Sequence, residues 1–393
     1  MKILFLMSSG FDRHSTSEHL LTAVIEALCR DGHSVHILQR ATGGPLPAIP
    51  ESLKGFPVTT EAIPFSAAEK GNLIARYVKG IQHLRACGKR IAPDFDAAFI
   101  QSTPVGGWAV RMVRRRLPKA RITFNVQDIF PYNAVYSGNL KESSPVFRLL
   151  ARLQRRAYTG ADQIITISED MKRTLAEAGA PENRISVVYN WSYQDGLYEQ
   201  VDTAPVRHMF DPAFFNVVYA GNIGVMQNVD ILLGAAELMR ADEGVRFHIV
   251  GSGAYREKLE ARAKEKGLDN LSFWPMQPPE LAPAVYSAAD VNVIPLVKNV
   301  YRTALPSKTA TCLACQRPII FAVGRESLFG QLAQREAGCP VTESDSPQEL
   351  ADAIRALRKG GSSRAGEFFL KYFSRTQNSR RYAGIITGGR RGE

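Results

Sequence analysis

Long hydrophobic runs are missing from this sequence. Hydrophobic residues make up 45% of its 393 positions, yet no stretch reaches the roughly 18 consecutive apolar residues that a membrane-spanning helix needs. Near the amino terminus, residues 3–7 form an apolar run that is shorter than the roughly 7–15 residues of a secretory signal core. We therefore expect neither an integral membrane protein nor one exported through a signal peptide.

Cysteine is scarce as well. Five cysteines, an odd number, are scattered along the chain without the pattern of a disulfide framework, which fits a reducing cytoplasm. Cys312 and Cys315 have CxxC spacing, but no second pair or histidine cluster completes a zinc site. We interpret them as two small buried thiols on a helix. The seven histidines show no HExxH or paired ligand spacing, so we predict no metal ion.

Nucleic-acid-binding motifs are also missing, although the net charge of +11 would suit a polyanion. The positive excess is uneven, because residues 85–121 hold nine Lys and Arg against Asp94 and Asp96. Such a patch suits an anionic bilayer surface or a phosphorylated substrate, or it consists of solvated helix faces. Without a recognisable motif, we expect no nucleic acid partner.

Short apolar runs alternate with amphipathic segments along the chain, which is typical of a parallel α/β sheet. Ser17 is expected to cap the first helix, which Gly32 ends. A stretch without periodicity at residues 192–212 separates two such series and indicates a linker. Two βα modules joined in this way predict two Rossmann-like domains facing each other across a cleft, a common place for a ligand. The predicted strands are 2–7, 34–38, 97–100, 122–126, 163–167 and 186–189, then 216–219, 247–250, 271–274, 291–295 and 319–323.

Glycine-containing turns follow two strands of the second module. Gly221, Asn222 and Gly224 come after the first of its strands, and Gly251 and Gly253 come after the second. Glycine lets backbone N–H groups approach a phosphate closely, so both turns are candidate anion sites. A dinucleotide fingerprint fails at the second turn, since the chain has an arginine where the third glycine would stand.

The loop after the strand at 291–295 carries two basic residues. Arg302 and Lys308 stand on either side of Pro306 and Ser307, ahead of a predicted helix. Two fixed cations would neutralise a diphosphate leaving group. From the spacing alone, two exposed basic residues near a helix start are an equal alternative.

Taken together, these segments resemble a GT-B glycosyltransferase of family 4, and within it the branch that includes bacterial N-acetylfucosamine transferases of surface-polysaccharide synthesis. The resemblance covers almost the whole chain, and the order and spacing of its segments are specific only in combination. It rests on residues 126–131, 167–169 and 190–191 in the first module, and on 219–224, 250–253, 288–290, 302 and 306–308 in the second.

The chain departs from the family at several positions. The wider family has one glutamate near the donor sugar and one near the ribose, and by register these fall at Thr303 and Thr311. Thr311 puts the usual ribose contact in doubt. Gln227 or Asn228 replaces a basic residue that is common after the first glycine turn. Phosphate contact would then depend more on the two cations and on backbone amides.

Asp128 follows the strand at 122–126 and should lie at the carboxyl edge of the sheet, where open α/β folds bind ligands. The resemblance implies that it faces the acceptor hydroxyl or the donor sugar, whereas a turn aspartate before Pro131 is the structural alternative. Asp94 and Asp96 have the DxD spacing of metal-dependent GT-A transferases. They precede a strand within a βα series, so we assign them no metal.

The resemblance implies a retaining, metal-independent glycosyltransferase that uses no cofactor. It would move a hexosyl or N-acetylhexosaminyl unit from a nucleotide diphosphate, expected to be UDP, to a hydroxyl of a glycan or of a polyprenyl-diphosphate-linked acceptor in bacterial cell-surface polysaccharide synthesis. Two alternatives stay open: a non-catalytic GT-B partner subunit, which the two threonines favour, and a hydrolysing nucleotide-sugar epimerase of the same fold. The predicted catalytic residues are Arg302, Lys308 and Asp128, and the predicted donor-binding residues are Gly221, Asn222, Gly224, Gly251, Gly253, Pro306, Ser307 and Thr311.

The domain boundaries follow from the same pattern. Residues 1–195 are expected to bind the acceptor, 196–212 to form the linker and 213–373 to bind the nucleotide sugar. Residues 374–393 would form a helix that packs back on the first domain, followed by a basic tail. We expect a cytoplasmic protein held peripherally at the inner face of the cell membrane.

Two basic helices would make that contact with an anionic membrane. A helix over residues 107–117 places Arg111, Arg114 and Arg115 on or near one face. Residues 148–156 form a second basic and amphipathic stretch, whose leucines face either the protein core or the membrane. These leucines are Leu149, Leu150 and Leu153.

Overall fold

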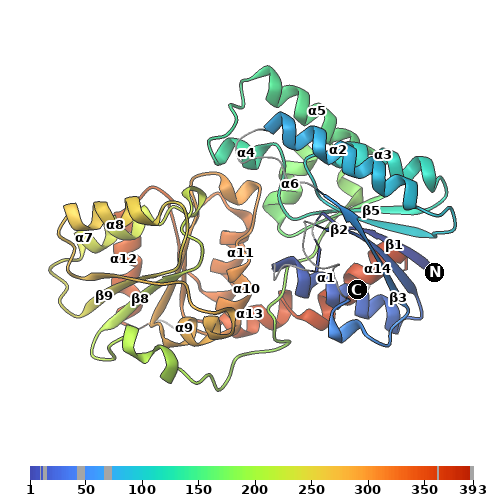
Figure 1. Cartoon of the computed structure of the whole chain (residues 1–393). Helices are drawn as coiled ribbons and strands as arrows, with labels where there is room; N and C mark the ends of the chain where they lie inside the picture. The colour runs from blue at the N-terminus through green and yellow to red at the C-terminus, as the bar shows by residue number, and fades with distance from the viewer. Residues whose placement is uncertain (9, 12–15, 42–48, 66–72, 361–362, 390–393) are drawn as a thin grey trace. The chain divides into compact units, whose positions relative to one another are not determined.

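The chain folds into two compact units (Figure 1). The computed structural model describes residues 1–389 except 9, 12–15, 42–48, 66–72 and 361–362. The first unit comprises Met1–Asn190 together with Arg375–Glu393, and the second comprises Trp191–Ser374. Each unit is built on one parallel sheet with helices between successive strands.

The first unit holds a seven-stranded sheet in the order β3-β2-β1-β4-β5-β6-β7. Every pair of neighbouring strands in it is parallel. Its strands are β1 (Lys2–Leu6), β2 (Ser34–Ala41), β3 (Val58–Pro64), β4 (Ala97–Gln101), β5 (Arg121–Val126), β6 (Gln163–Thr166) and β7 (Ile185–Val187). Its α-helices are α1 (Thr16–Arg30), α2 (Leu73–Arg90), α3 (Gly106–Arg116), α4 (Tyr132–Tyr136), α5 (Pro145–Gly160), α6 (Glu169–Glu177) and α14 (Arg375–Thr387).

The second unit holds a six-stranded parallel sheet in the order β10-β9-β8-β11-β12-β13. Its strands are β8 (Phe215–Ala220), β9 (Val245–Val250), β10 (Leu271–Trp274), β11 (Val291–Pro295), β12 (Ile319–Ala322) and β13 (Val341–Thr342). Its α-helices are α7 (Asp230–Leu238), α8 (Arg256–Glu265), α9 (Ala282–Ala288), α10 (Lys308–Ala314), α11 (Leu328–Ala337), α12 (Pro347–Arg358) and α13 (Ala365–Tyr372).

All eleven predicted strands are present, and the α/β prediction is confirmed. The structure adds β3 and β13, which sequence periodicity missed. β3 is a half-polar edge strand that ends in Pro64, and β13 is two residues long, so neither carries a clear apolar run. The first helix begins at Thr16, which places Ser17 inside the helix instead of at its cap.

Strand order reverses once in each sheet. In the first unit the chain builds β1, β2 and β3 outward and then returns to the other side of β1 with β4. In the second unit the same reversal falls between β8 and β11. At such a switch point the loops after the two central strands diverge, leaving a crevice at the carboxyl edge where ligands bind.

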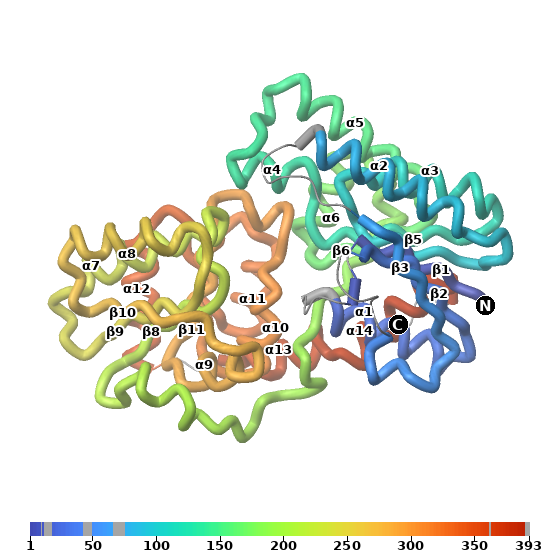
Figure 2. Tube along the Cα trace, viewed as in Figure 1, coloured from blue at the N-terminus to red at the C-terminus, as the bar shows by residue number. Residues whose placement is uncertain are grey.

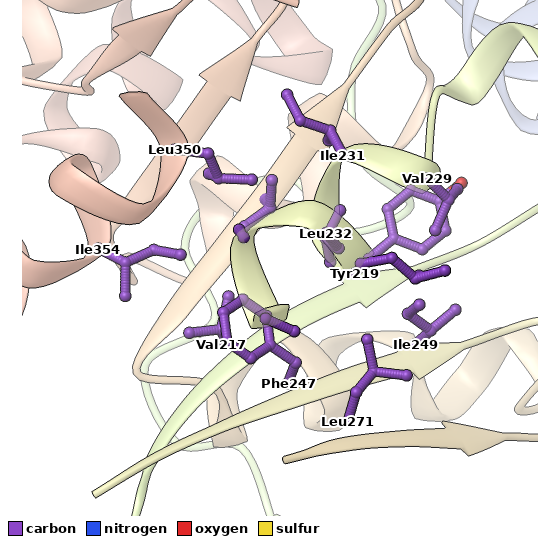
Figure 3. Packing of buried hydrophobic residues seen from close by; sticks show 14 of the residues in the cluster. Val217, Tyr219, Val229, Ile231, Leu232, Phe247, Ile249, Leu271, Leu350 and Ile354 are labelled. Carbon is purple, nitrogen blue, oxygen red and sulfur yellow. The ribbon is translucent and has the colours of Figure 1, made fainter. Parts of the chain in front are cut away.

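The core of the second unit joins its sheet to α7 and α12 (Figure 3). Val217 and Tyr219 of β8 and Phe247 of β9 are each 0% exposed. They pack among Leu232 of α7 and Leu350 of α12. This packing fixes the carboxyl ends of β8 and β9, from which the glycine-containing turns leave.

The last helix, α14, belongs to the first unit, where it packs against α1 (Figure 2). The hydroxyl of Tyr382 donates to Asn125 Oδ1 over 3.2 Å and accepts from Gln127 Nε2 over 3.2 Å. Asn378 Nδ2 donates to the carbonyl of Tyr189 over 3.0 Å. Each such buried bond contributes about 0.5–1.5 kcal/mol net, so α14 is an integral part of this unit.

Residues 204–210, within the predicted linker, belong to the second unit and pack against its strands β9 and β10. The ring of Phe210 stands edge-on to His248 at 5.0 Å, and His208 stands edge-on to Trp274 at 5.9 Å. Trp274 Nε1 donates to His248 Nδ1, which makes His248 Nε2 the protonated nitrogen that donates to Asn216 Oδ1 over 2.9 Å. His248 is therefore held neutral, and burial lowers its pKa to about 4.

This histidine predicts acid sensitivity of the second unit. The unfolded chain binds a proton at His248 below its ordinary pKa of 6.5, while the folded chain does not until about 4. The unfolding free energy should therefore fall by about 3 kcal/mol as the pH drops through that window. Urea unfolding at a series of pH values should show a smaller decrease for His248→Gln. His208→Gln, an exposed neighbour, should retain the wild-type slope, and identical slopes for all three proteins would disprove the assignment.

Candidate functional site

The switch point of the second unit brings the loops after β8 and β11 together. Lys308 begins α10, at the end of the β11–α10 loop, and Gly221 directly follows β8. A methyl group placed on Gly221 would lie 2.6 Å from Lys308 Nζ, so the ammonium lies directly against this glycine. Gly221 has φ +136°, which itself favours glycine.

Lys308 is a buried cation without a hydrogen-bonding or ionic partner among the described residues. Its Nζ is fully covered and stands 3.8 Å from the ring centroid of Tyr219. Burial lowers the pKa of this lysine to about 8. A cation–π contact returns only part of the free energy that desolvation of a charge costs. The site is therefore poised to accept an anion.

The two glycine turns interlock backbone to backbone. The N–H of Gly221 donates to Val250 O over 2.9 Å, and that of Ile223 donates to Ser252 O over 2.8 Å. A Cβ on Gly251 would lie 1.9 Å from Gly221 O, and one on Gly253 would lie 2.3 Å from Ile223 O. These glycines are thus required by the contact between the turns. The expectation that the whole 221–224 turn offers amides to a phosphate needs correction, because two of those amides are already bonded.

The rest of the first turn is held by side chains. Tyr219 donates its hydroxyl hydrogen to the carbonyl of Asn222. Asn222 Nδ2 approaches Gln227 Oε1 at 3.4 Å, and a Cβ on Gly224 would lie 2.6 Å from that oxygen. Gln227 therefore folds back over the turn. Asn228 has φ 48° and donates to Ser344 O, so neither side chain at the usually basic position contributes a charge.

Arg256 has a structural role that its sequence context did not reveal. Its guanidinium donates through Nη1 to the carbonyls of Gly251 and Trp274, and through Nε to Glu260. The residue that replaced the third glycine of a dinucleotide fingerprint therefore ties the loops after β9 and β10 together. The signal was its position at the start of a helix, directly after the glycine turn.

The β11–α10 loop places the remaining predicted donor residues. Arg302 ends the 3-10 turn η6 (Val300–Arg302), and its N–H donates to Asn299 O over 3.0 Å. Thr303 is 1% exposed and donates to Val300 O, so it has a structural partner. Pro306 O accepts from the N–H of Thr309, and Ser307 is exposed.

Thr311, the other threonine at a family glutamate position, lies in a chain of hydroxyl groups. Its Oγ1 is 3.3 Å from Ser192 Oγ, which is in turn 3.2 Å from the hydroxyl of Tyr198. Ser192 is buried. Hydroxyls both donate and accept, so this chain can bind a sugar hydroxyl but supplies no carboxylate.

In the first unit, Asp128 is exposed just beyond the carboxyl end of β5. This position is one strand away from the switch point between β1 and β4. The adjacent Gln127 is fixed by Tyr382 and by Asn190, whose Nδ2 donates to Gln127 Oε1 over 2.7 Å. The predicted roles of Asp128 and of the donor residues stay predictions.

The DxD sequence lies at the opposite edge of that sheet. The N–H of Lys2 donates to Asp96 Oδ2 over 2.7 Å, and its ammonium pairs with Asp94 Oδ2 over 2.6 Å. Both aspartates thus fasten the amino ends of β1 and β4. Among the residues that the structure describes, no three His, Cys, Asp or Glu side chains gather at a site that would hold a metal ion. Cys312 and Cys315 are buried free thiols, as predicted.

Part of the basic segment 85–121 serves the fold. Arg114 Nη2 pairs with Asp162 at 2.6 Å while Nη1 donates to Ala120 O, and Arg121 Nε donates to Ile385 O in α14. Arg115 and Arg116 are exposed. Arg114 therefore has partners within the fold, and the predicted membrane contact of this helix stays a prediction. None of the described helices combines the length and hydropathy needed to cross a membrane.

Comparison with known proteins identifies both units. Residues 18–191 match the Glycosyl transferase 4-like domain, and residues 215–359 match the Glycosyl transferases group 1 domain. With two Rossmann-like parallel sheets, the chain has the GT-B fold and carries the two domains of that glycosyltransferase family. Both matched domains are glycosyltransferase domains.

The chain is also similar to individual glycosyltransferases and to solved structures. The chain is 28% identical over 249 residues to WcaI of Escherichia coli (strain K12), named for colanic acid biosynthesis and glycosyl transfer, across 61% of this chain and 60% of WcaI. It is 28% identical over 300 residues to a D-inositol 3-phosphate glycosyltransferase of Nocardia farcinica, across 72% of this chain and 65% of that protein. Each match spans less than two thirds of the relative. Anabaena HepE, solved with UDP and glucose, shares the fold at a TM-score of 0.61 and 17% identity, with 98% of this chain and 95% of that chain covered.

The interlocked turns make a prediction about stability. Gly251→Ala forces a methyl group into the carbonyl of Gly221 and should lower the unfolding free energy by about 1–3 kcal/mol, as overpacking does. Urea unfolding measures this change. Gly384→Ala is the control, because its Cβ would meet no atom within 4 Å and alanine favours a helix. Equal midpoints for Gly251→Ala and the wild type would show that the turns do not depend on this glycine.

Proposed function

We propose that this protein is a retaining glycosyltransferase that moves a sugar from a UDP-sugar to a hydroxyl of a glycan or a polyprenyl-diphosphate-linked acceptor. The observation that carries the proposal is the buried ammonium of Lys308 at the switch point of the second unit, which has no hydrogen-bond or ionic partner in the part of the chain that the structure describes. A diphosphate seated over Gly221 would supply the missing counter-charge. An anion there also favours the charged form of a lysine whose pKa is about 8.

Each group has a defined part in this proposal. Lys308 and Arg302 neutralise the charge that develops on the departing diphosphate. The amides of Asn222 and Gly224, which are not bonded in the contact between the turns, face the phosphate. Thr311 offers its hydroxyl to the ribose. Asp128 receives the acceptor, and by resemblance to the family the leaving phosphate itself assists removal of the acceptor proton.

The proposed donor and the proposed polysaccharide role are supported by the names of similar proteins. HepE is described as a complex with UDP and glucose, which supports a UDP-linked donor here. The name of WcaI refers to colanic acid biosynthesis, which supports a role in bacterial cell-surface polysaccharide. A hexosyl or N-acetylhexosaminyl unit, the latter as in the N-acetylfucosamine branch, is the sugar we propose.

Turnover by a Lys308 variant tests this assignment. Lys308→Ala should lower kcat by about 10²–10³, as loss of a preorganised charge donor does, in an assay that follows both UDP release and lengthening of the glycan. Lys298→Ala is the matched control, because Lys298 is an exposed lysine on the same loop. Since the proposed chemistry needs no metal ion, wild-type turnover should persist in EDTA.

The same assay separates the alternatives. A non-catalytic subunit would neither release UDP nor extend the glycan, and an epimerase would release UDP without an acceptor. Undiminished turnover of Lys308→Ala would reject the diphosphate role. Loss of wild-type activity in EDTA that Mn²⁺ restores would reject metal independence.

We also propose peripheral attachment to the inner face of the membrane through the first unit, in the cytoplasm. Helices α2, α3 and α5 lie side by side there (Figure 1). Trp108 of α3 is 42% exposed, and Leu149 of α5 is 56% exposed next to the exposed Arg148 and Arg152. Leu150 instead belongs to the core. Apolar side chains flanked by arginines are typical of surfaces that bind anionic lipid.

Liposome co-sedimentation tests this attachment. Each basic residue near an anionic surface contributes about 1 kcal/mol. Changing Arg115, Arg116 and Arg148 together to Glu should weaken binding by at least about a hundredfold. Binding of the wild type should require anionic lipid and fall with added salt.

A charge-matched control comes from the second unit. Lys258, Lys264 and Lys359 are exposed there, and their reversal changes the net charge by the same amount. Equal loss of binding in both triple variants would reduce the effect to net charge, and sedimentation with neutral liposomes would reject electrostatic attachment.

A further inference from the structure

Arg40 lies near the carboxyl end of β2, in the first unit. Neighbouring residues of the strand point to opposite faces of the sheet, and Gln39 and Arg40 illustrate this. Gln39, which is 0% exposed, accepts from the N–H of Phe11 and donates to Thr60 Oγ1. On the other face, Arg40 meets Phe65, which follows β3, and Cys87 of α2.

The guanidinium of Arg40 has no hydrogen-bond or ion-pair partner among the residues that the structure describes. Its Nε is buried without one, and the centre of the group stands 4.3 Å from the ring centroid of Phe65. Burial lowers the pKa of this arginine. The nearby carboxylate of Glu61 is paired with Arg90 at 3.1 Å. Arg40 thus contrasts with Gln39, whose amide oxygen and nitrogen are both bonded.

The described groups around Arg40 add no compensating negative charge. His83 of α2 stands edge-on to Phe65 at 5.3 Å, and burial together with the charge of Arg40 lowers its pKa to about 4, so it is neutral at physiological pH. The pKa of Cys87 is raised to about 12 by burial, so this thiol is protonated. A cation that packs on an aromatic ring beside a neutral imidazole and a thiol loses part of its hydration, and an anion that joins it offsets this cost.

We propose that Arg40, backed by Phe65 and His83, is a subsite for an oxyanion of the acceptor, either a phosphate or a sugar carboxylate. This deepens the proposed function, since it makes the acceptor an anionic molecule. The position is suitable, because β2 ends at the same edge of the sheet as β1 and β4, between which the strand order reverses, and open α/β sheets bind ligands at that edge. A guanidinium also presents its donors as a planar fork that matches two oxygens of one anion.

Anion binding is measured without turnover. Hydrogen–deuterium exchange, followed by mass spectrometry, should show slower exchange in residues 34–41 and 73–90 when pyrophosphate is added to the wild-type protein. Arg40→Gln should weaken this protection on the order of 10–100-fold, and Arg40→Lys should retain part of it. Arg90→Gln is the matched control, because Arg90 is an exposed arginine whose partner is known. Unchanged protection in Arg40→Gln would overturn the proposal.

Two further variants distinguish this subsite from the donor site and from an ion pair of Arg40 within the protein. Lys308→Gln removes the proposed donor contact in the second unit, and protection of the first unit should persist in it. Protection of the first unit by pyrophosphate does not depend on the role of Lys308. The subsite at Arg40 and the donor site at Lys308 can therefore be disproved independently. Glu69→Gln removes the only carboxylate between residues 65 and 73. If pyrophosphate protects this variant but not the wild type, Arg40 already has a protein partner and the proposal is wrong.

Parallel titrations identify the source of the anion. Pyrophosphate represents the diphosphate of a lipid-linked acceptor, and glucuronate represents an acidic sugar. Protection by pyrophosphate alone assigns the subsite to the diphosphate, and protection by glucuronate alone assigns it to the glycan. Protection by neither overturns the proposal.

Discussion

The contact between the ammonium of Lys308 and the backbone of Gly221 is the interaction on which the candidate donor site depends. It requires that β8 and β11 be neighbours although they are distant in sequence, and only the reversal of strand order provides this. It also requires a residue without a side chain at position 221, since a Cβ would lie 2.6 Å from the nitrogen. A lysine on a solvated loop would have water as its partner. Here the fold removes the water and leaves the charge, so binding of an anion relieves a cost already present in the free protein.

Rigidity of that site comes from contacts between the turns and from a neighbouring arginine. Gly251 and Gly253 allow the second turn to bond to the first, and Arg256 ties the second turn to the end of β10. The first unit uses the same principle, because Tyr382 of α14 holds Gln127 beside Asp128. In both cases the predicted functional residue is held by a neighbour whose role was invisible in the sequence. Contacts within the fold thus fix the backbone of these turns, whereas the exposed side chains on them have fewer such contacts.

Strand periodicity predicted most of the fold, and its two failures have one cause. Neither strand shows a period: β3 at the sheet edge has neither a continuous apolar run nor strict alternation of polar and apolar residues, and β13 is only two residues long. The glycine turns and Lys308 were predicted because strand–glycine–helix order is local. The bonds that occupy the amides of Gly221 and Ile223 were not predictable, because their acceptors lie on another strand. Nor was the hydroxyl chain of Thr311, whose partner Ser192 is more than a hundred residues away.

The number of charged residues in a segment does not show which of them are already paired within the fold. Residues 85–121 carry a large positive excess, and sequence alone treats each arginine in them alike. In the folded protein these arginines differ in whether a carboxylate or a carbonyl lies within hydrogen-bonding distance. Arg114 has a carboxylate and a carbonyl, and Arg121 has a carbonyl of α14, so both stabilise the first unit. Lys308 and Arg40 lie outside that cluster, and the Nζ of Lys308 and the Nε of Arg40 are buried without a partner among the described residues. A cation's capacity to bind a ligand thus depends on whether its own protein has already neutralised it, and the density of charge along the chain does not report this.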